Sequence, residues 1–568
     1  MAASTIQSRV SGISQRWTGP LILELDLTDG LTETRPSDPV SAVLARRRAA
    51  LADVLDGLRR ACSDHRVRAL VVKLGGRPIG LAQVQELRAA VTALRQAGKH
   101  TVAWAESFGE FSAGNVPYYL ATAFDTICLQ PSGDLGLTGI AVERLFLRDA
   151  LDRLGVEFQV AARYEFKSAA EQLTERGYTP ASREATERLT ASITEQLADA
   201  IAERRGIEPP EARKLIDRGP FLAAQALELG LVDALGYRDE VFAAVRKQAG
   251  QEAALHPLGK YQRSRAMAER ARGLAAPRER EVALIYATGP IRRGRSGRGP
   301  LAGGSMGSDT IAAALRAAVS DEHVRAIVLR VSSPGGSYVA SDTIWREVVR
   351  ARNAGKPVVV SMGDVAASGG YFISMAADAI IAQPGTVTGS IGVITAKPVL
   401  GRMLSKASVT TDSVSQGEHA AMFGTIHPFT DDEWALVNGW LDHIYADFTG
   451  KVAEGRGMTQ ERVHELARGR VWTGADAAAN GLVDELGGLD HAAAVARRRA
   501  GLPADAPLRA YPRTRPVDRI RPPASSDAPG AAAASVLAES WGPAWRLAAR
   551  VGLPAYGPLA LPGSWTFE

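Results

Sequence analysis

The segment VRAIVLRVSSPGG (residues 324–336) decides the fold, because a closely similar segment, VRALVVKLGGRPIG, begins at Val67. Two further pairs of segments follow in the same order: YYLATAFDTICLQP from Tyr118 with YFISMAADAIIAQP from Tyr371, and GLVDALG from Gly230 with GLVDELG from Gly481. The offsets within the three pairs are 257, 253 and 251 residues. Because these offsets differ so little, the chain contains one fold twice, with small insertions.

Apolar, β-branched runs alternate with helix-patterned segments in both copies. First strands are expected in PLILELDL (20–27) and EVALIYATGPI (281–291), and later strands in ALVVKL, in AIVLRV and after each AGK triplet. Helices are expected over four further segments: residues 40–61, 164–205, 310–321 and 371–380. This alternation of strands and helices predicts right-handed crossovers, mostly parallel sheets and an α/β fold in two tandem βα repeats.

The repeats divide the chain into five expected parts. These are an N-terminal segment (1–19), a degenerate N-terminal repeat (20–262), a polar helical connector (263–280), a C-terminal repeat (281–502) and a Pro/Ala-rich linker with an apolar tail (503–568). The tail carries Trp541 and Trp545, so it is a candidate for contact with a membrane surface or another subunit. Packing against its own domain is the alternative. The Gly/Arg-rich stretch 292–308 lacks the pattern of a phosphate-binding loop and is expected to be a surface loop.

The composition argues against several classes of protein. With 568 residues, 46% hydrophobic and 23% charged, the chain is typical of a soluble globular protein. A net charge of +5 without a dense basic patch argues against a nucleic-acid partner. Cys62 and Cys128 have no partner pattern and are expected to be thiols, and no metal or cofactor motif occurs. We expect no signal peptide and no spanning helix, so the expected location is cytoplasmic or peripheral at a membrane.

Three polar motifs distinguish the second copy from the first. VSSPGGS (331–337) places Gly335 and Gly336 in a tight turn with exposed N–H groups, and such N–H groups can form an oxyanion hole. AASGGY (366–371) places Ser368 among small neighbours, and the Gly369 N–H and a helix N-terminus there are expected to favour negative charge. VTGSIG (387–392) carries Ser390.

The first copy lacks both serines. In the register of the duplication, Ser368 aligns with Asn115 and Ser390 with Leu137. A duplication that keeps the scaffold and differs at clustered polar positions indicates one working site and one degenerate copy.

A serine nucleophile needs a base, and no histidine lies between His323 and His419. The chain has 10 lysines among its 67 basic residues, and lysine, unlike arginine, can lose its proton near neutral pH when buried. Three lysines need no catalytic role. Arg330 stands at the position of Lys73 in the second copy, so a charge suffices there, and solvation accounts for Lys99 and Lys356 at matching AGK positions. Lys167, in YEFKSA (164–169), is the best candidate, with a surface lysine as the alternative; Lys397, seven residues after Ser390, stays open.

AASGGY, SPGG and TGSIG, preceded by a tandem repeat that carries YEFKSA, resemble the long form of bacterial signal peptide peptidase A, also called protease IV. The resemblance covers about residues 20–500. It implies a Clp/crotonase-like fold and a Ser–Lys dyad assembled from both repeats of one protomer. The implied roles are nucleophile for Ser368, general base for Lys167, lysine orientation for Ser390, and oxyanion-hole N–H groups from Gly369 and from Gly335 or Gly336.

The resemblance also implies substrates and partners. Remnant signal peptides and other extended hydrophobic peptides are the expected substrates, and a homo-oligomer, a tetramer in the long form, is the expected assembly. No cofactor or metal is expected. Long-form members usually carry an N-terminal membrane anchor, which is not seen here, so either the C-terminal tail attaches the protein peripherally or the protein acts in the cytoplasm.

Two other functions stay open. A crotonase-like acyl-CoA hydratase or isomerase would use paired oxyanion N–H groups, but it needs acid/base carboxylates, and only Asp364 lies close to Ser368 in sequence. A catalytically inactive oligomeric scaffold is the third hypothesis.

Overall fold

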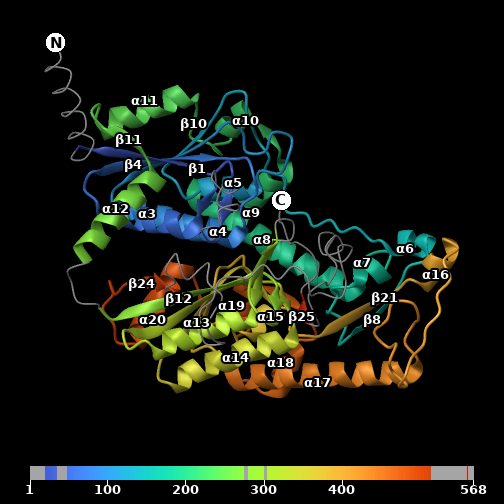
Figure 1. The fold of residues 1–568 in the computed structure, drawn as a ribbon. Coiled ribbons are helices and arrows are strands. Elements are labelled where there is room, and N and C mark those ends of the chain that lie inside the picture. The colour runs from blue at the N-terminus through green and yellow to red at the C-terminus, as the bar shows by residue number, and fades with distance from the viewer. Residues whose placement is uncertain (1–18, 35–47, 274–278, 300–302, 513–558, 561–568) are drawn as a thin grey trace, which may run out of the picture. The chain divides into compact units, whose positions relative to one another are not determined.

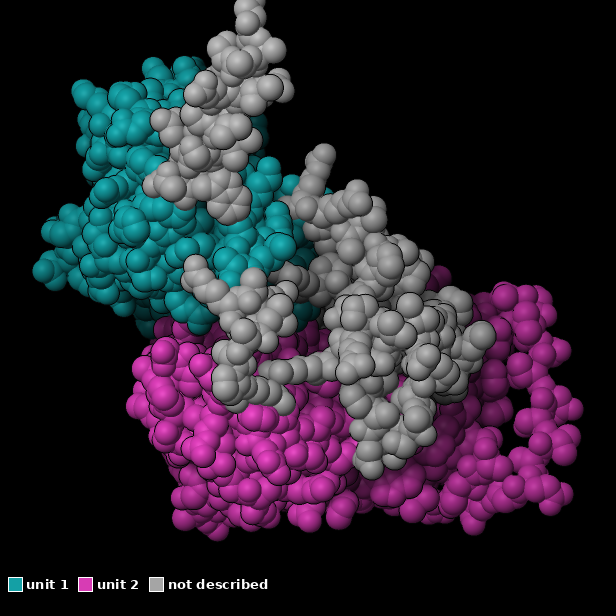
Figure 2. Space-filling view, turned by 60° about the vertical axis from the view of Figure 1, so that its left-hand side comes forward, with its two compact units in different colours: residues 1–141, 193–277, 566–568 teal, residues 142–192, 278–565 magenta. Residues whose placement is uncertain are grey.

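The computed structural model describes residues 19–34, 48–273, 279–299, 303–512 and 559–560 (Figure 1). The chain forms two compact units, coloured separately in Figure 2: unit 1 comprises residues 1–141, 193–277 and 566–568, and unit 2 comprises residues 142–192 and 278–565. Residues 142–192, which belong to the N-terminal repeat in sequence, therefore lie in unit 2. The five-part division by repeats stays a prediction.

Unit 1 contains a six-stranded parallel sheet in the order β10-β6-β5-β4-β1-β11. Its strands are β1 (Leu21–Asp26), β4 (Val67–Leu74), β5 (His100–Ala105), β6 (Thr126–Leu129), β10 (Ala234–Leu235) and β11 (Ala254–Pro257). Its longer helices are α3 (Leu51–Ser63), α4 (Leu81–Gln96), α5 (Asn115–Ala121), α9 (Pro209–Arg218), α11 (Arg238–Ala249) and α12 (Leu258–Gly273).

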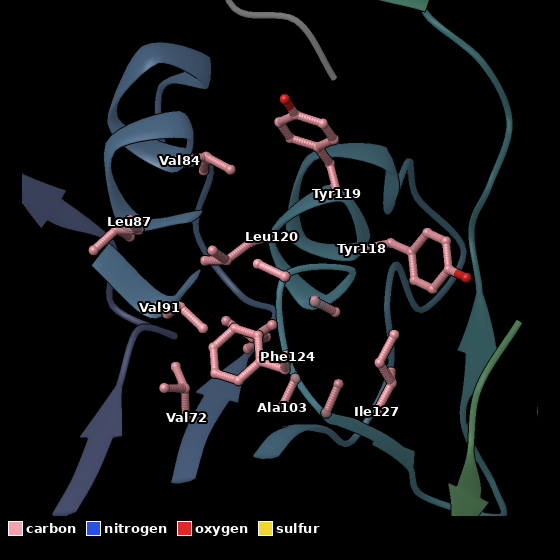
Figure 3. Close-up of a cluster of buried hydrophobic side chains, with 14 of the residues drawn as sticks. Val72, Val84, Leu87, Val91, Ala103, Tyr118, Tyr119, Leu120, Phe124 and Ile127 are labelled. Atoms are coloured by element: carbon pink, nitrogen blue, oxygen red, sulfur yellow. The ribbon is translucent and has the colours of Figure 1, made fainter. Parts of the chain in front are cut away.

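Alternate residues of β1 enter two different cores, because successive side chains of a strand point to opposite faces. Leu21, Leu23 and Leu25 join the larger cluster with α3, α4 and α5, part of which is drawn in Figure 3. Ile22 joins the smaller cluster with α11. Helices therefore cover both faces of the sheet.

Unit 2 repeats this plan with a larger sheet in the order β22-β20-β18-β16-β12-β24, to which β19 and β23 add beside β18. Every pair is parallel except β20 with β22. The strands are β12 (Glu281–Thr288), β16 (Val324–Ser333), β18 (Val358–Ala367), β19 (Ala379–Ala382), β20 (Val387–Gly389), β22 (Val471–Thr473), β23 (Glu485–Leu486) and β24 (Leu508–Ala510). Helices α13 (Ser308–Ser320) and α14 (Tyr338–Asn353) share one core with the sheet, and α20 (Leu489–Arg499) shares the other.

Unit 2 also contains two smaller sheets. Strand β8 (Glu157–Ala162), from the N-terminal repeat, pairs antiparallel with β21 (Ile394–Val399) of the C-terminal repeat. A five-stranded sheet runs β14-β15-β13-β17-β25. Its strands are β13 (Ile291–Arg292), β14 (Gly297–Gly299), β15 (Gly303–Gly307), β17 (Gly335–Gly336) and β25 (Leu559–Ala560).

Two long helices also contribute to the cores: α8 (Pro180–Arg205) and α17 (Asp431–Arg456) have 26 residues each and place buried side chains in the larger core clusters of unit 1 and unit 2, respectively. The remaining elements are short. They are β2 (Leu31–Thr32), β3 (Ala49–Ala50), β7 (Asp134–Leu135), β9 (Phe221–Leu222), α6 (Arg148–Leu154), α7 (Glu171–Thr174), α10 (Ala223–Glu228), α15 (Gly369–Phe372), α16 (Gly401–Lys406), α18 (Gln460–Leu466) and α19 (Gly474–Ala479). In the part of the chain that the structure describes, no helix combines the length and hydropathy needed to cross a membrane.

The predicted α/β class with mostly parallel sheets is confirmed, and four local predictions need correction. The helix expected over 371–380 ends at Phe372, and the end of that stretch belongs instead to strand β19 (Ala379–Ala382), which pairs with β18. The helix expected over 164–205 begins at Pro180, and α7 is one turn. The helix expected over 40–61 begins only at Leu51 among the described residues. The stretch 292–308 contains β14 and β15 rather than only a surface loop. Trp541 and Trp545 lie outside the described residues.

Candidate active site

Ser368 lies where β18 ends and α15 begins, and its side chain is fully buried. Its φ is +55°, an uncommon backbone conformation for a residue other than glycine. The Ser368 N–H donates to the carbonyl of Gly389 at 2.8 Å, which fixes this turn against β20. The expected strand-to-helix turn is therefore present, and it holds the serine in a conformation that costs free energy.

Lys167 lies in the turn between β8 and α7 and is 4% exposed. Its Nζ lies 2.8 Å from Ser368 Oγ, 2.9 Å from Ser390 Oγ and 2.9 Å from the Ser390 carbonyl oxygen. Ser390 follows β20, is 1% exposed, and donates its N–H to the Arg470 carbonyl at 2.7 Å. The structure thus brings together the three side chains singled out in the sequence, and all three belong to unit 2.

The surroundings of Lys167 favour the neutral amine. Burial lowers the pKa of Lys167 to about 7, because a charged ammonium loses its hydration when it is enclosed by protein. The three hydrogen-bond partners of its Nζ are neutral oxygens. The amine is therefore available to accept a proton near neutral pH, in reach of the Ser368 hydroxyl.

Strand pairing and one glycine fix the backbone of Lys167. The pairing of β8 with β21 runs up to the bond from the Arg163 N–H to the Val393 carbonyl at 3.0 Å, and the Phe166 N–H donates to the Arg468 carbonyl at 3.1 Å. Gly469 has a φ of +87°, and a Cβ there would lie 2.4 Å from Lys167 N and 2.5 Å from its Cα. Sequence reasoning missed Gly469, because nothing in ARGRVW shows that a backbone 302 residues earlier passes beside it.

The expected oxyanion-hole glycines also lie together. A Cβ on Gly335 would be 2.7 Å from the Gly369 nitrogen, and a Cβ on Gly369 would be 3.1 Å from the Gly336 nitrogen. The Gly335 N–H donates to Ser333 Oγ at 3.2 Å. Because α15 has only four residues, the helix dipole expected at Gly369 contributes little, and backbone N–H groups carry any stabilisation of negative charge.

The other candidate lysines have partners of their own. Lys397 Nζ donates to the Met422 carbonyl at 2.7 Å and lies 4.0 Å from the centroid of the Phe429 ring. Lys73 pairs with Glu106, Lys99 donates to the Asp64 carbonyl, and Lys356 donates to the carbonyls of Ala318 and Asp321. Of the candidate lysines, Lys167 is the one that contacts Ser368.

The corresponding position of the first copy is occupied by structural groups. Asn115 Oδ1 accepts from the N–H groups of Thr138 and Gly139 at 3.0 and 3.1 Å, and its Nδ2 donates to the Gly139 carbonyl at 2.8 Å. Leu137 is fully buried in the core of unit 1. The amide thus holds the turn together and offers no nucleophile. Among the described residues, no cluster of His, Cys, Asp and Glu side chains is arranged to hold a metal.

Comparisons with known proteins identify the family of the chain. The model of "Peptidase family S49" matches residues 93–252 and 350–503, once in each copy of the duplicated fold. Serine protease SPPA, chloroplastic, from Arabidopsis thaliana is 31% identical over 448 residues, which cover 78% of this chain and 65% of that protein, slightly less than two thirds of its length.

Two bacterial relatives are covered more fully. Protease 4 of Salmonella typhi is 35% identical over 465 residues, or 80% of this chain and 72% of that protein. Protease 4 of Haemophilus influenzae is 31% identical over 493 residues, which cover 84% of this chain and 78% of that protein. Among solved structures, a mutant of ClpP1 from Listeria monocytogenes aligns with 37% of this chain at 16% identity and a TM-score of 0.24, a score too low to bear on function. The resemblance to protease IV is confirmed by the family match and by these relatives, and the chain belongs to peptidase family S49, as a serine peptidase.

Proposed function

We propose that the protein is a serine endopeptidase with a Ser–Lys dyad, in which Ser368 is the nucleophile and Lys167 the general base. The observation that carries this proposal is the 2.8 Å approach of Lys167 Nζ to Ser368 Oγ in an interior where the pKa of the lysine falls to about 7. A nucleophile in hydrogen-bond reach of a base, with the base held by a third group, is the arrangement that activates a serine. Ser390 is that third group.

The chemistry follows from these positions. Neutral Lys167 accepts the proton of the Ser368 hydroxyl, and the serine oxygen forms a bond to the carbonyl carbon of the scissile peptide. The N–H of Gly369 and that of Gly335 or Gly336 stabilise the negative oxygen of the tetrahedral intermediate, and Gly336 is preferred because the Gly335 N–H already donates to Ser333 Oγ. The lysine ammonium then gives its proton to the leaving nitrogen as the C–N bond breaks. In the second half, Lys167 takes a proton from water as the water oxygen bonds to the acyl carbon. The bond from that carbon to the Ser368 oxygen then breaks, the lysine ammonium returns its proton to Ser368, and the acid product leaves.

We propose extended hydrophobic peptides, including remnant signal peptides, as substrates. An extended peptide binds beside a strand through main-chain hydrogen bonds, and β17, whose Gly335 lies against the Gly369 nitrogen, is the strand with which a substrate would pair. In this structure β25 occupies that side of β17. A homo-oligomer, a tetramer in particular, and peripheral contact with a membrane remain predictions from the resemblance. The acyl-CoA hydratase or isomerase has less support, because a lysine rather than a carboxylate contacts Ser368.

Peptide hydrolysis with a defined pH dependence tests the proposed function. We expect kcat/KM for a quenched hydrophobic peptide without ionisable side chains to rise about tenfold per pH unit below pH 7 and to level off above it. Activity should fall as the pH falls, because a general base must be neutral. Burial lowers the pKa of Lys167 to about 7, so below that pH the amine becomes protonated. A folded wild type that cleaves no peptide between pH 5.5 and 9 would favour the inactive scaffold, and a flat profile would exclude Lys167 as the base.

Replacing Ser390 by alanine is expected to lower kcat about 10- to 100-fold and to change KM little. The substitution removes one of the two Ser390 oxygens that hold Lys167 Nζ, so the four-carbon side chain spends less time in line with Ser368. The matched control is Ser374→Ala, since Ser374 is also buried but its hydroxyl donates to the Gly370 carbonyl at 2.7 Å. Equal losses in both variants would mean that Ser390 acts only through packing.

A further inference from the structure

Leu559 and Ala560, described residues near the C-terminus, lie beside the candidate active site. Strand β25 pairs antiparallel with β17, with Gly335 opposite Ala560 and Gly336 opposite Leu559. β25 is the last strand of the five-stranded sheet, so it covers the edge that β17 would otherwise present. A strand edge that is left open accepts another extended segment, and here that segment comes from the same chain.

The contact reaches the groups around Ser368. A Cβ built on Gly335 would lie 1.9 Å from the Leu559 carbonyl oxygen, 2.7 Å from the Gly369 nitrogen and 3.1 Å from the Ala367 carbonyl oxygen. The Leu559 carbonyl therefore lies in the same small space as the backbone on both sides of the nucleophile. Gly335 has a φ of +97°, which favours glycine, and a side chain at this position would clash with the Leu559 carbonyl oxygen.

The side chain of Leu559 is enclosed as well. It is 0% exposed and belongs to the main apolar core cluster of unit 2. Burying a leucine side chain is worth roughly 1.5–3 kcal/mol, which adds a side-chain anchor to the main-chain pairing. Main-chain pairing for affinity together with a pocket for one side chain is how extended peptides are recognised at strand edges.

We propose that Leu559–Ala560 occupies the strand position of a peptide substrate and competes in cis with peptides that come from solution. This inference rests on the proposed function in one respect, namely that substrates add to the β17 edge. Only one segment can pair with that edge at a time, so the C-terminal segment must leave before a substrate binds.

Tethering makes the competition measurable. A segment linked to its own site has an effective concentration on the order of 1 mM. If the tethered segment binds its site with a dissociation constant of about 0.1 mM, within the usual range for enzyme substrates, it raises the apparent KM of an added peptide about tenfold. Because the competitor occupies the site and does not change the chemistry, kcat stays the same.

The kinetic test uses the full-length chain with Leu559→Arg, which places a charge in the enclosed leucine position. We expect the KM for a quenched hydrophobic peptide to fall about tenfold with kcat unchanged. The matched control is Leu222→Arg, because Leu222 is 66% exposed and lies in unit 1. Intact mass checks that each protein retains its C-terminus. A KM within twofold of the wild type in a folded Leu559→Arg protein would overturn the proposal.

A binding measurement separates this proposal from the proposed function, because it needs no turnover. The probe is a fluorescent peptide with the sequence AYGPLALPGS, residues 555–564, added to proteins that carry Ser368→Ala. We expect it to bind Ser368→Ala/Leu559→Arg at least tenfold more tightly than Ser368→Ala alone. Equal binding to both proteins, or to neither, would overturn the cis occupant even if the wild type proves to be an active peptidase.

Discussion

Replacing Ser368 by alanine is expected to lower kcat for peptide hydrolysis by at least about four orders of magnitude, the scale on which loss of a serine nucleophile acts in other serine hydrolases. In the proposed mechanism, the substitution removes the oxygen that forms the acyl-enzyme and leaves the backbone N–H groups of Gly369 and Gly336 in place. The residual rate is therefore the one that substrate binding and the oxyanion hole provide without covalent catalysis. The measurements are turnover of a quenched hydrophobic peptide and labelling by a fluorophosphonate, which should be lost together.

The duplicated fold supplies a matched control for this substitution. Asn115 stands at the position of Ser368 in the first copy, and its amide bonds hold the turn at Thr138 and Gly139. Asn115→Ala is expected to cost roughly 1–3 kcal/mol of unfolding free energy for the buried groups it leaves unpaired, while kcat stays within a few-fold of the wild type. If Ser368→Ala keeps its activity and its label, the nucleophile lies elsewhere.

Much of the scaffold was predictable because it depends on patterns that repeat. Runs such as AIVLRV give buried parallel strands in any chain, and the second copy of each run confirmed the first. The helix predicted from YFISMAADAI failed for a tertiary reason. Its apolar residues suit a helix or a strand equally, and the free edge of β18 decides for a strand over Ala379–Ala382.

The site was predictable only in part. Ser368 and Ser390 stood out because the first copy lacks them, and the scarcity of lysine drew attention to Lys167, but residue patterns alone left Lys397 open. The choice between the two lysines depends on the pairing of β8 with β21, which joins segments more than 200 residues apart. The close approach of Gly469 to Lys167 and the return of Leu559 to β17 depend on contacts of the same long range, for which one sequence carries no signal.

Replacing Lys167 by methionine is expected to lower kcat by about three to four orders of magnitude while the protein stays folded. Methionine has nearly the volume of the lysine stem and brings no charge into the interior, so the loss reports chemistry rather than unfolding. Lys167→Arg separates charge from basicity, because arginine keeps the positive charge but does not deprotonate in a protein. We therefore expect Lys167→Arg to be as inactive as Lys167→Met at every pH between 5.5 and 9.

Lys397 provides the control that makes the lysine experiment decisive. It is also buried, at 5% exposure, and its Nζ also donates to a backbone carbonyl, that of Met422, but it has no bond to Ser368. If burial of any lysine mattered only for the fold, Lys397→Met and Lys167→Met would lose activity alike. The general-base role requires that Lys397→Met stay within a few-fold of the wild type and that thermal unfolding of folded Lys167→Met be no earlier than that of Lys397→Met. The reverse pattern, an active Lys167→Met beside an inactive Lys397→Met, would move the base to Lys397 and leave the 2.8 Å contact between Lys167 and Ser368 without a catalytic role.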